Sequence, residues 1–240
     1  MKMWSAVFGT LFRVLTFRAR REELIAMNWR HLTVGLFFTW LAGMGRYWDN
    51  PRAEQLQVYG FGSVIYVFAL SALVYVVVWA LRPRDWRYSN LLTFVTLTSP
   101  PAILYAIPVE MFMSRGAATS VNSWFLAIVA ALRLALLVTY LKRVPALTGV
   151  DLVTGSLLPV VLVIVSLTML NLQHAVFDIM RGTEATPEDA AYMVLLLLTC
   201  LSMVLVWPLL LAYFFRVAEL WPPKDGKDPQ EISPDDSDPP

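Results

Sequence analysis

The chain has 240 residues, of which 58% are hydrophobic and only 15% are charged. Soluble domains are about 45–50% apolar and about 25% charged, so this composition argues against an ordinary soluble globular protein. The net charge of +1 gives no reason to expect a nucleic-acid partner, and the single cysteine, Cys200, excludes an intrachain disulfide and a cysteine-based metal site.

The first predicted element is an amphipathic helix over residues 4–15, within a basic interfacial region spanning residues 1–30. Its apolar residues fall on one helical face: Trp4, Val7, Phe8, Leu11, Phe12 and Leu15. The surrounding residues are cationic: Lys2, Arg13, Arg18, Arg20 and Arg21. The pattern predicts a helix in the headgroup region, with its apolar side toward the hydrocarbon and its cations near anionic lipid. The alternative is a helix packed against the membrane spans themselves.

Six apolar blocks within residues 31–216 predict a bundle of six transmembrane helices. The blocks are residues 32–45, 58–81, 91–113, 124–141, 152–170 and 190–215. The first is the weakest, because its 14 residues extend about 21 Å against a hydrocarbon core of about 30 Å. It crosses if Arg30 and Arg46 reach toward the two membrane surfaces. The third block is interrupted by Pro100, Pro101 and Pro108.

The composition changes after Arg216. Residues 217–240 contain seven acidic residues and six prolines, with almost nothing apolar after Trp221. Such a segment buries too little apolar surface to offset the entropy of ordering it. We therefore expect a disordered acidic tail.

The distribution of cations predicts the orientation. With six spans, 14 of the Lys and Arg residues fall on the side of the two termini and 4 fall on the other side. Cytoplasmic loops carry the excess of Lys and Arg, so both termini are predicted to be cytoplasmic. If residues 32–45 did not cross, the N-terminal cations would move outside and the bias would reverse, which favours a crossing by this short block.

Two charged residues within the apolar blocks are candidate functional residues. Arg133 lies near the middle of the fourth block, where a charge costs at least about 2.5–3.5 kcal/mol. Glu110 lies about one turn from the outer end of the third block. Either the two form a structural ion pair between neighbouring helices, or they belong to an ion or proton pathway. Ala127, Ala131 and Ala135 form a small-residue stripe on the other side of the fourth block, which predicts a central position for this helix.

A polar stripe follows the fifth block. Asn171, His174 and Asp178 share one helical face, and Glu110 is predicted on the same side of the membrane. His174, Asp178 and Glu110 would supply three ligands for a metal ion; the alternative is a hydrogen-bonded polar cap at the interface, since no second histidine is nearby. We assign no catalytic, cofactor-binding or metal role to any residue.

Residues 89–110 resemble a segment of uncharacterised bacterial polytopic membrane proteins. More loosely, residues of about 58–170 resemble bacterial Yip-type membrane domains, in which a span, a short basic loop and a span carrying Pro-Ala (here Pro101-Ala102) precede a span that begins with Trp (here Trp124). The chain departs from that family in having six predicted spans rather than five, and it lacks the Asp-Leu-Tyr-Gly-Pro sequence of eukaryotic members. The resemblance implies membrane organisation or partner binding, and it transfers no functional residue.

These observations predict an integral protein of the bacterial inner membrane, without enzymatic activity or cofactor. It would organise lipid or bind partners through its basic N-terminal region and its acidic tail, with other membrane proteins or a homo-oligomer as candidate partners. One alternative is a small transporter or channel component that uses Glu110 and Arg133. A second is an intramembrane enzyme or metal-binding protein that uses His174 and Asp178.

Overall fold

The computed structural model describes residues 2–47, 55–170 and 190–221, and all regular structure within them is helical. The α-helices are α1 Lys2–Leu15, α2 Arg21–Ile25, α3 Trp29–Tyr47, α4 Gln55–Val58, α5 Phe61–Trp79, α6 Tyr88–Leu97, α7 Arg115–Arg143, α8 Gly149–Met169 and α10 Ala190–Leu220. Two 3-10 helices, η1 Pro100–Ala106 and η2 Val109–Met111, follow α6. The predicted all-helical class is confirmed.

Four of these helices are long and apolar enough to cross a membrane, namely α5, α7, α8 and α10. Their most apolar windows have mean hydropathies of 2.1 to 2.3. Pro159 lies inside α8 and Pro208 inside α10, and both helices continue past the proline. The protein is therefore a multi-pass helical membrane protein by the length and composition of its helices.

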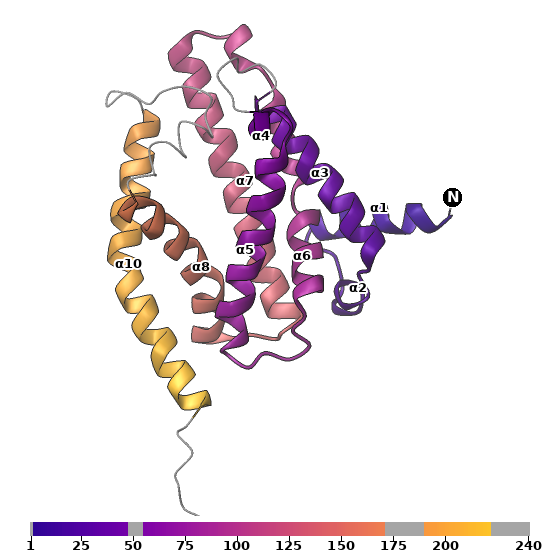
Figure 1. Cartoon of the computed structure of the whole chain (residues 1–240), viewed down its shortest axis with the longest axis vertical. Coiled ribbons are helices and arrows are strands. Elements are labelled where there is room, and N and C mark those ends of the chain that lie inside the picture. The colour runs from indigo at the N-terminus through magenta and orange to yellow at the C-terminus, as the bar shows by residue number, and fades with distance from the viewer. Residues whose placement is uncertain (1, 48–54, 171–189, 222–240) are drawn as a thin grey trace, which may run out of the picture.

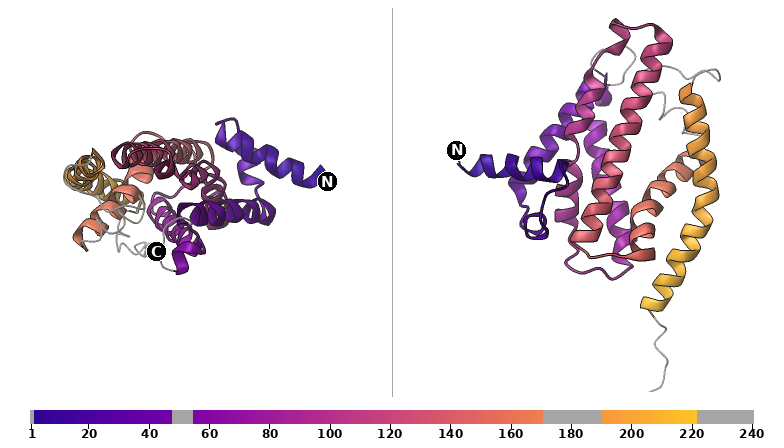
Figure 2. Two further views of the ribbon diagram at one scale, coloured as in Figure 1. Left: turned by 90° about the horizontal axis from the view of Figure 1, so that it is seen from above. Right: turned by 180° about the vertical axis from the view of Figure 1, so that it is seen from behind.

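The long elements run back and forth through the molecule (Figure 1). The chain runs from the lower end to the upper end along α3, down along α5, up through α6 and η1, down along α7, up along α8 and down along α10. The amphipathic helix α1 lies across this direction and projects sideways from the bundle, as the views from above and from behind also show (Figure 2). The helix predicted over residues 4–15 is thus present.

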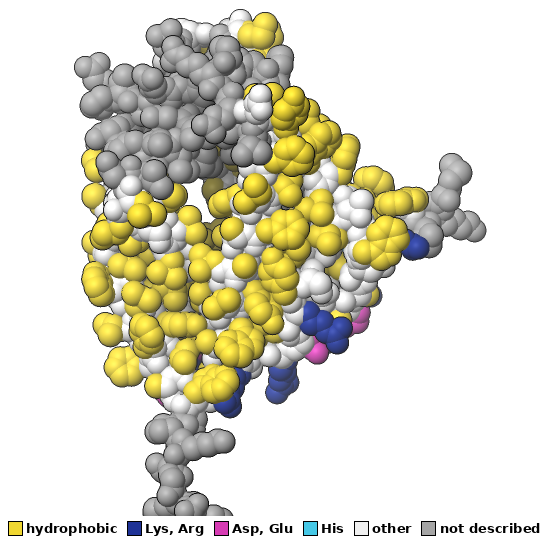
Figure 3. Space-filling model, viewed as in Figure 1, with side chains coloured by type: hydrophobic (Ala, Val, Ile, Leu, Met, Phe, Trp, Pro, Cys, Tyr) yellow, Lys and Arg dark blue, Asp and Glu magenta, His cyan; other side chains and the backbone are white. Residues whose placement is uncertain are grey.

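Positive charge gathers at the lower end of the bundle, here called the basic end. Lys and Arg side chains follow this edge, and hydrophobic side chains cover the surface above it (Figure 3). The cations come from the start of α3, from the turns after α5 and α7, and from the end of α10: Arg30, Arg82, Arg84, Arg87, Lys142, Arg143 and Arg216. This separation gives the bundle one charged end and an apolar middle.

The most enclosed helix is α6, which corrects the prediction that the fourth block is central. Every residue from 90 to 99 is buried, whereas Ala127, Ala131 and Ala135 of α7 are exposed. The helix α3 packs closely on α6 at Gly35, which has no side chain. A Cβ atom added to Gly35 would lie 2.3 Å from Thr96 Oγ1. The predicted close approach at the alanine stripe of the fourth block is therefore wrong for the described residues, and a close approach occurs at Gly35 of α3 instead.

The upward path through α6 is interrupted where two prolines follow each other. α6 ends at Leu97, and the 3-10 helix η1 begins at Pro100. Neither Pro100 nor Pro101 has an N–H group to continue the α-helical ladder. The predicted interruption of the third block is therefore present, and it leaves the end of an α-helix inside the bundle.

α10 extends beyond the predicted start of the tail, to Leu220. Two contacts explain the extension. Val217 and Leu220 pack against the main hydrophobic core, and Trp221 Nε1 donates a hydrogen bond to the Ala80 carbonyl oxygen at 3.0 Å. Arg216 also pairs with Asp151 of α8 through two hydrogen bonds of 2.8 and 2.9 Å. The boundary predicted at residue 217 is thus too early, and residues 222–240 lie outside the described residues.

Candidate functional site

Arg133 reaches the end of α6. Its Nε donates a hydrogen bond to Thr98 Oγ1 at 3.2 Å, and its Nη2 donates to the Val95 carbonyl oxygen at 3.5 Å. The Thr98 hydroxyl in turn donates to the same Val95 carbonyl oxygen at 2.7 Å. The guanidinium group therefore lies at the C-terminus of a helix that stops inside the bundle.

This position suits a positive charge. The last carbonyl groups of an α-helix lack partners within the helix and carry partial negative charge, which favours a cation nearby by roughly 0.3–1 kcal/mol, and more when buried. The prolines after Thr98 remove the donors that would have continued the helix. Arg133 and the Thr98 hydroxyl donate to the Val95 carbonyl oxygen, whose usual α-helical donor, the Ser99 N–H, donates to the Thr96 carbonyl oxygen instead. The sequence predicted a charge within the membrane at Arg133 and an interruption at Pro100 and Pro101, but it did not predict that Arg133 contacts the end of α6.

Further polar side chains surround the break. The Thr39 hydroxyl donates to the Gly35 carbonyl oxygen at 2.9 Å, and it lies 2.8 Å from the Ser99 hydroxyl, which donates to it. Thr39 and Ser99 are each 2% exposed. We call Thr39, Thr98, Ser99 and Arg133 the polar junction. Sequence reasoning missed all three hydroxyl groups of the junction, although the run Thr98-Ser99-Pro100-Pro101 marks where the helix stops.

The other predicted candidates are not brought into this junction by any described contact. The backbone of Glu110 belongs to η2, and its side chain lies outside the described residues, so the predicted pair with Arg133 stays a prediction. Asn171, His174 and Asp178 also lie outside the described residues. Among the side chains that are described, no three His, Cys, Asp or Glu residues gather as a metal site requires.

The apolar stripe of α1 divides into two parts. Val7, Leu11 and Val14 are buried in the main core, whereas three aromatic side chains beside them are exposed. The exposed fractions are 45% for Trp4, 50% for Phe8 and 64% for Phe12. The interpretation of a helix packed on the bundle is therefore confirmed for one side of α1. The other side faces away from the bundle, and its location in the headgroup region stays a prediction.

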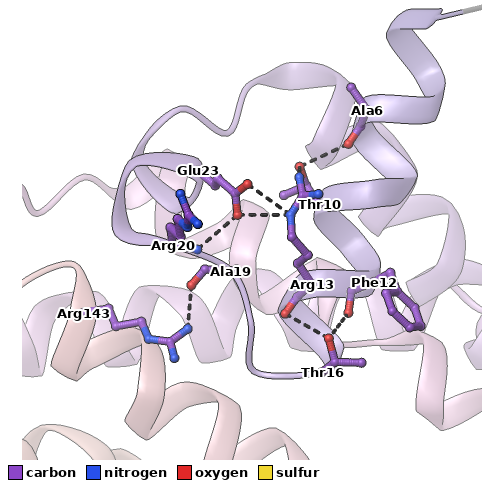
Figure 4. A network of polar contacts seen from close by, with 9 residues as sticks. All are labelled: Ala6, Thr10, Phe12, Arg13, Thr16, Ala19, Arg20, Glu23 and Arg143. Atoms are coloured by element: carbon purple, nitrogen blue, oxygen red, sulfur yellow. Dashed lines mark hydrogen bonds and ion pairs between the residues drawn. The ribbon is translucent and has the colours of Figure 1, made fainter.

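The cations around α1 differ in their surroundings (Figure 4). Arg13 forms an ion pair with Glu23, whose carboxylate also accepts a hydrogen bond from the Arg20 backbone N–H. Arg21 pairs with Asp85. Arg18 and Arg20 are exposed, and no ion pair among the described residues involves either side chain. Pairing with acids thus leaves part of the predicted positive charge facing solvent.

Arg143 links the turn between α1 and α2 to the end of α7. From the end of α7 it donates hydrogen bonds to the carbonyl oxygens of Ala19 and, at 2.9 Å, of Phe17. Phe17 has a backbone φ angle of 61°, in the left-handed region that residues other than glycine rarely adopt. Asn90 of α6 adds a hydrogen bond to the Ile25 carbonyl oxygen. These contacts hold α1 and α2 in a defined orientation at the basic end.

Comparison with known proteins gives no relative for this chain: no family model, no curated protein and no solved structure matches it.

Proposed function

We propose that this chain is a six-span integral protein of the inner membrane, with both termini in the cytoplasm. It would organise lipid or bind partners at the cytoplasmic surface, without enzymatic activity. The observation that carries the proposal is α1, which lies across the direction of the bundle, is joined to the end of α7 through Arg143, and exposes Trp4, Phe8 and Phe12 (Figure 1). An exposed aromatic face beside cations is typical of a helix in the lipid headgroup region.

Six crossings follow if α3 and the broken α6–η1 segment span the membrane together with the four long apolar helices. Both elements run upward and contact α5, which runs the other way (Figure 1). Aromatic residues at both ends support two interfaces, since such residues collect there. Trp79 and Trp221 are exposed at the basic end, and Phe112 and Trp124 are exposed near the upper end.

The polar junction favours a structural role for Arg133 over a transport pathway. Two of its hydrogen-bond donors are engaged by Thr98 and by a backbone carbonyl group. Both partners belong to the helix end that the prolines created, so the charge is matched to a fixed feature of the fold.

The placement of α1 is testable by site-directed spin labelling. In a Cys200→Ser background, labels are attached at Trp4→Cys and Phe8→Cys, with Ala6→Cys as the matched control. Ala6 is exposed on the opposite side of the helix, about 160° from Phe8. In vesicles that contain anionic lipid, we expect the labels at positions 4 and 8 to be accessible to oxygen dissolved in the hydrocarbon.

The control label at position 6 is expected to be accessible to a water-soluble nickel reagent instead. Equal exposure of all three labels to the nickel reagent would place α1 in water and contradict the proposal. The full chain is used, because the docked side of α1 depends on the bundle.

A further inference from the structure

A small half-open pocket lies between the α1–α2 turn and the basic end of α6 and α7. Its walls include Phe17 and Ala19 from the turn, Phe94 from α6, and Leu136, Tyr140 and Arg143 from α7. The enclosed part has the volume of about one water molecule. It therefore admits a single polar group presented from outside, rather than a whole small molecule.

Tyr140, one of the residues that line this pocket, carries a buried hydroxyl group without a described partner. The residue is 1% exposed, and within residues 2–47, 55–170 and 190–221 its hydroxyl has no hydrogen-bond partner. Its ring stacks on Phe94 with 4.2 Å between the ring centroids, so the side chain is held in place. Buried hydroxyl groups are nearly always hydrogen-bonded, because leaving one without a partner costs free energy. A group that occupies the pocket would supply the partner.

Arg143 adds positive charge to the same pocket. Two of the five N–H groups of its guanidinium donate to the carbonyl oxygens of Phe17 and Ala19. Three donors remain, in a planar arrangement suited to phosphate oxygens. Arg18, between the two residues that Arg143 holds, is exposed and adds a second positive charge at the turn. The pocket thus combines apolar walls, one buried donor and a cationic rim.

We propose that this pocket binds an anionic phospholipid. A lipid phosphate contacts Arg143, and a neighbouring lipid oxygen accepts a hydrogen bond from the Tyr140 hydroxyl. This inference rests on the proposed function, because the orientation given there places the basic end among the headgroups of the inner leaflet. Basic pockets between helices on the cytoplasmic side are suited to anionic headgroups. The chemistry is that of a phosphate anion, which a free phosphate ion shares.

The test compares thermal unfolding of the purified full chain in detergent with added phosphatidylglycerol, phosphatidylcholine or inorganic phosphate. For the unchanged protein, phosphatidylglycerol is expected to raise the unfolding midpoint by about 5 °C when present well above its dissociation constant. Phosphatidylcholine and inorganic phosphate are expected to produce no such rise. Tyr140→Phe, which keeps the ring and its stacking, is expected to lose most of the increase caused by phosphatidylglycerol.

Tyr213→Phe is the matched control. The Tyr213 hydroxyl already donates to the Val77 carbonyl oxygen at 3.0 Å, away from the pocket, so its removal lowers the midpoint equally under all conditions. If Tyr140→Phe also shifts the midpoint equally in every lipid, the pocket holds a water molecule or is empty, and the proposal is overturned. Stabilisation by inorganic phosphate alone would assign the site to a free anion instead.

The spin-label experiment separates this proposal from the proposed function. Labels that place α1 in the headgroup region, together with a lipid-independent effect of Tyr140→Phe, reject the pocket alone. Labels that place α1 in water reject the proposed function, whatever the unfolding midpoints show.

Discussion

Helices α6 and α10 differ in how much of their surface is covered by the rest of the protein. In α6 every residue from 90 to 97 is buried, and these residues include Asn90, Thr93 and Thr96. In α10 large apolar residues face outward; Leu197, for example, is 67% exposed. The helix with the more polar sequence is thus the one enclosed by protein, and the more apolar helix is the one left to face lipid.

This contrast bears on the proposal that α3 and the α6–η1 segment also cross the membrane. A lipid-facing helix must be apolar around most of its surface, because lipid offers no hydrogen bonds. A helix enclosed by other helices can carry Thr, Ser and Gly, which allow close packing and hydrogen bonding between helices. α6 belongs to the second kind, and α3 presents a buried face with Gly35, Thr39 and Gly43 to its neighbours. Neither helix is among the four that are long and apolar enough to be recognised as spans.

The largest expected effect concerns the contact between α3 and α6. Gly35→Ala is expected to lower the free energy of unfolding by about 3 kcal/mol, because the added Cβ would overlap Thr96 and force the helices apart. Gly62→Ala in α5 is the matched control, since nothing lies within 4 Å of its added Cβ. Unfolding in mixed micelles is the measurement. Equal effects at the two glycines would show that α6 is not closely enclosed.

A second prediction sharpens the role of the charge beside α6. Arg133→Leu is expected to lower the free energy of unfolding by about 2 kcal/mol, the loss of hydrogen bonds from a charged donor. Thr98→Val should cost about 1 kcal/mol, and the double variant should cost less than the sum, because the two side chains are in contact. Strictly additive losses of unfolding free energy would show that Arg133 does not interact with Thr98, and would contradict its assignment to the polar junction. A parallel cycle with Glu110→Gln tests the predicted ion pair.

The smallest expected effects compare the buried hydroxyl group of Thr39 with the exposed side chain of Leu201. Thr39→Val should cost about 0.6 kcal/mol, typical of one hydrogen bond between membrane helices. Leu201→Ala on α10 should cost less than about 0.5 kcal/mol, because that side chain is 49% exposed and lipid fills the space it leaves. Both losses are read from the same unfolding transitions. A greater loss at Leu201 would mean that α10 is covered by protein.

The sequence contained enough information for the helical class, the amphipathic helix α1 and the interruption of the third block. Each depends on a local pattern: unbroken apolar length, helical spacing of Trp4 through Leu15, or consecutive prolines at positions 100 and 101. These features are determined by neighbours in the chain. Local rules are therefore sufficient to predict them.

Contacts between distant segments were not predictable in the same way. Ala127, Ala131 and Ala135 have the spacing of a packing stripe, yet they are exposed, whereas Gly35 packs against Thr96. Both patterns permit close approach, and the choice depends on the placement of the whole bundle. The hydrogen bonds of Arg133 and Arg143 to backbone carbonyl groups escaped prediction for the same reason, because a carbonyl partner has no signature in the sequence.

The most direct test of the six-span account is the location of its loops. Reporter fusions within residues 82–88 and after Arg216 are expected to read cytoplasmic, and fusions within residues 46–57 and 182–188 are expected to read external. This outcome requires crossings by α3 and by the broken α6–η1 segment, in addition to the four long apolar helices. A cytoplasmic signal from residues 46–57, or an external signal after Arg216, would contradict the account.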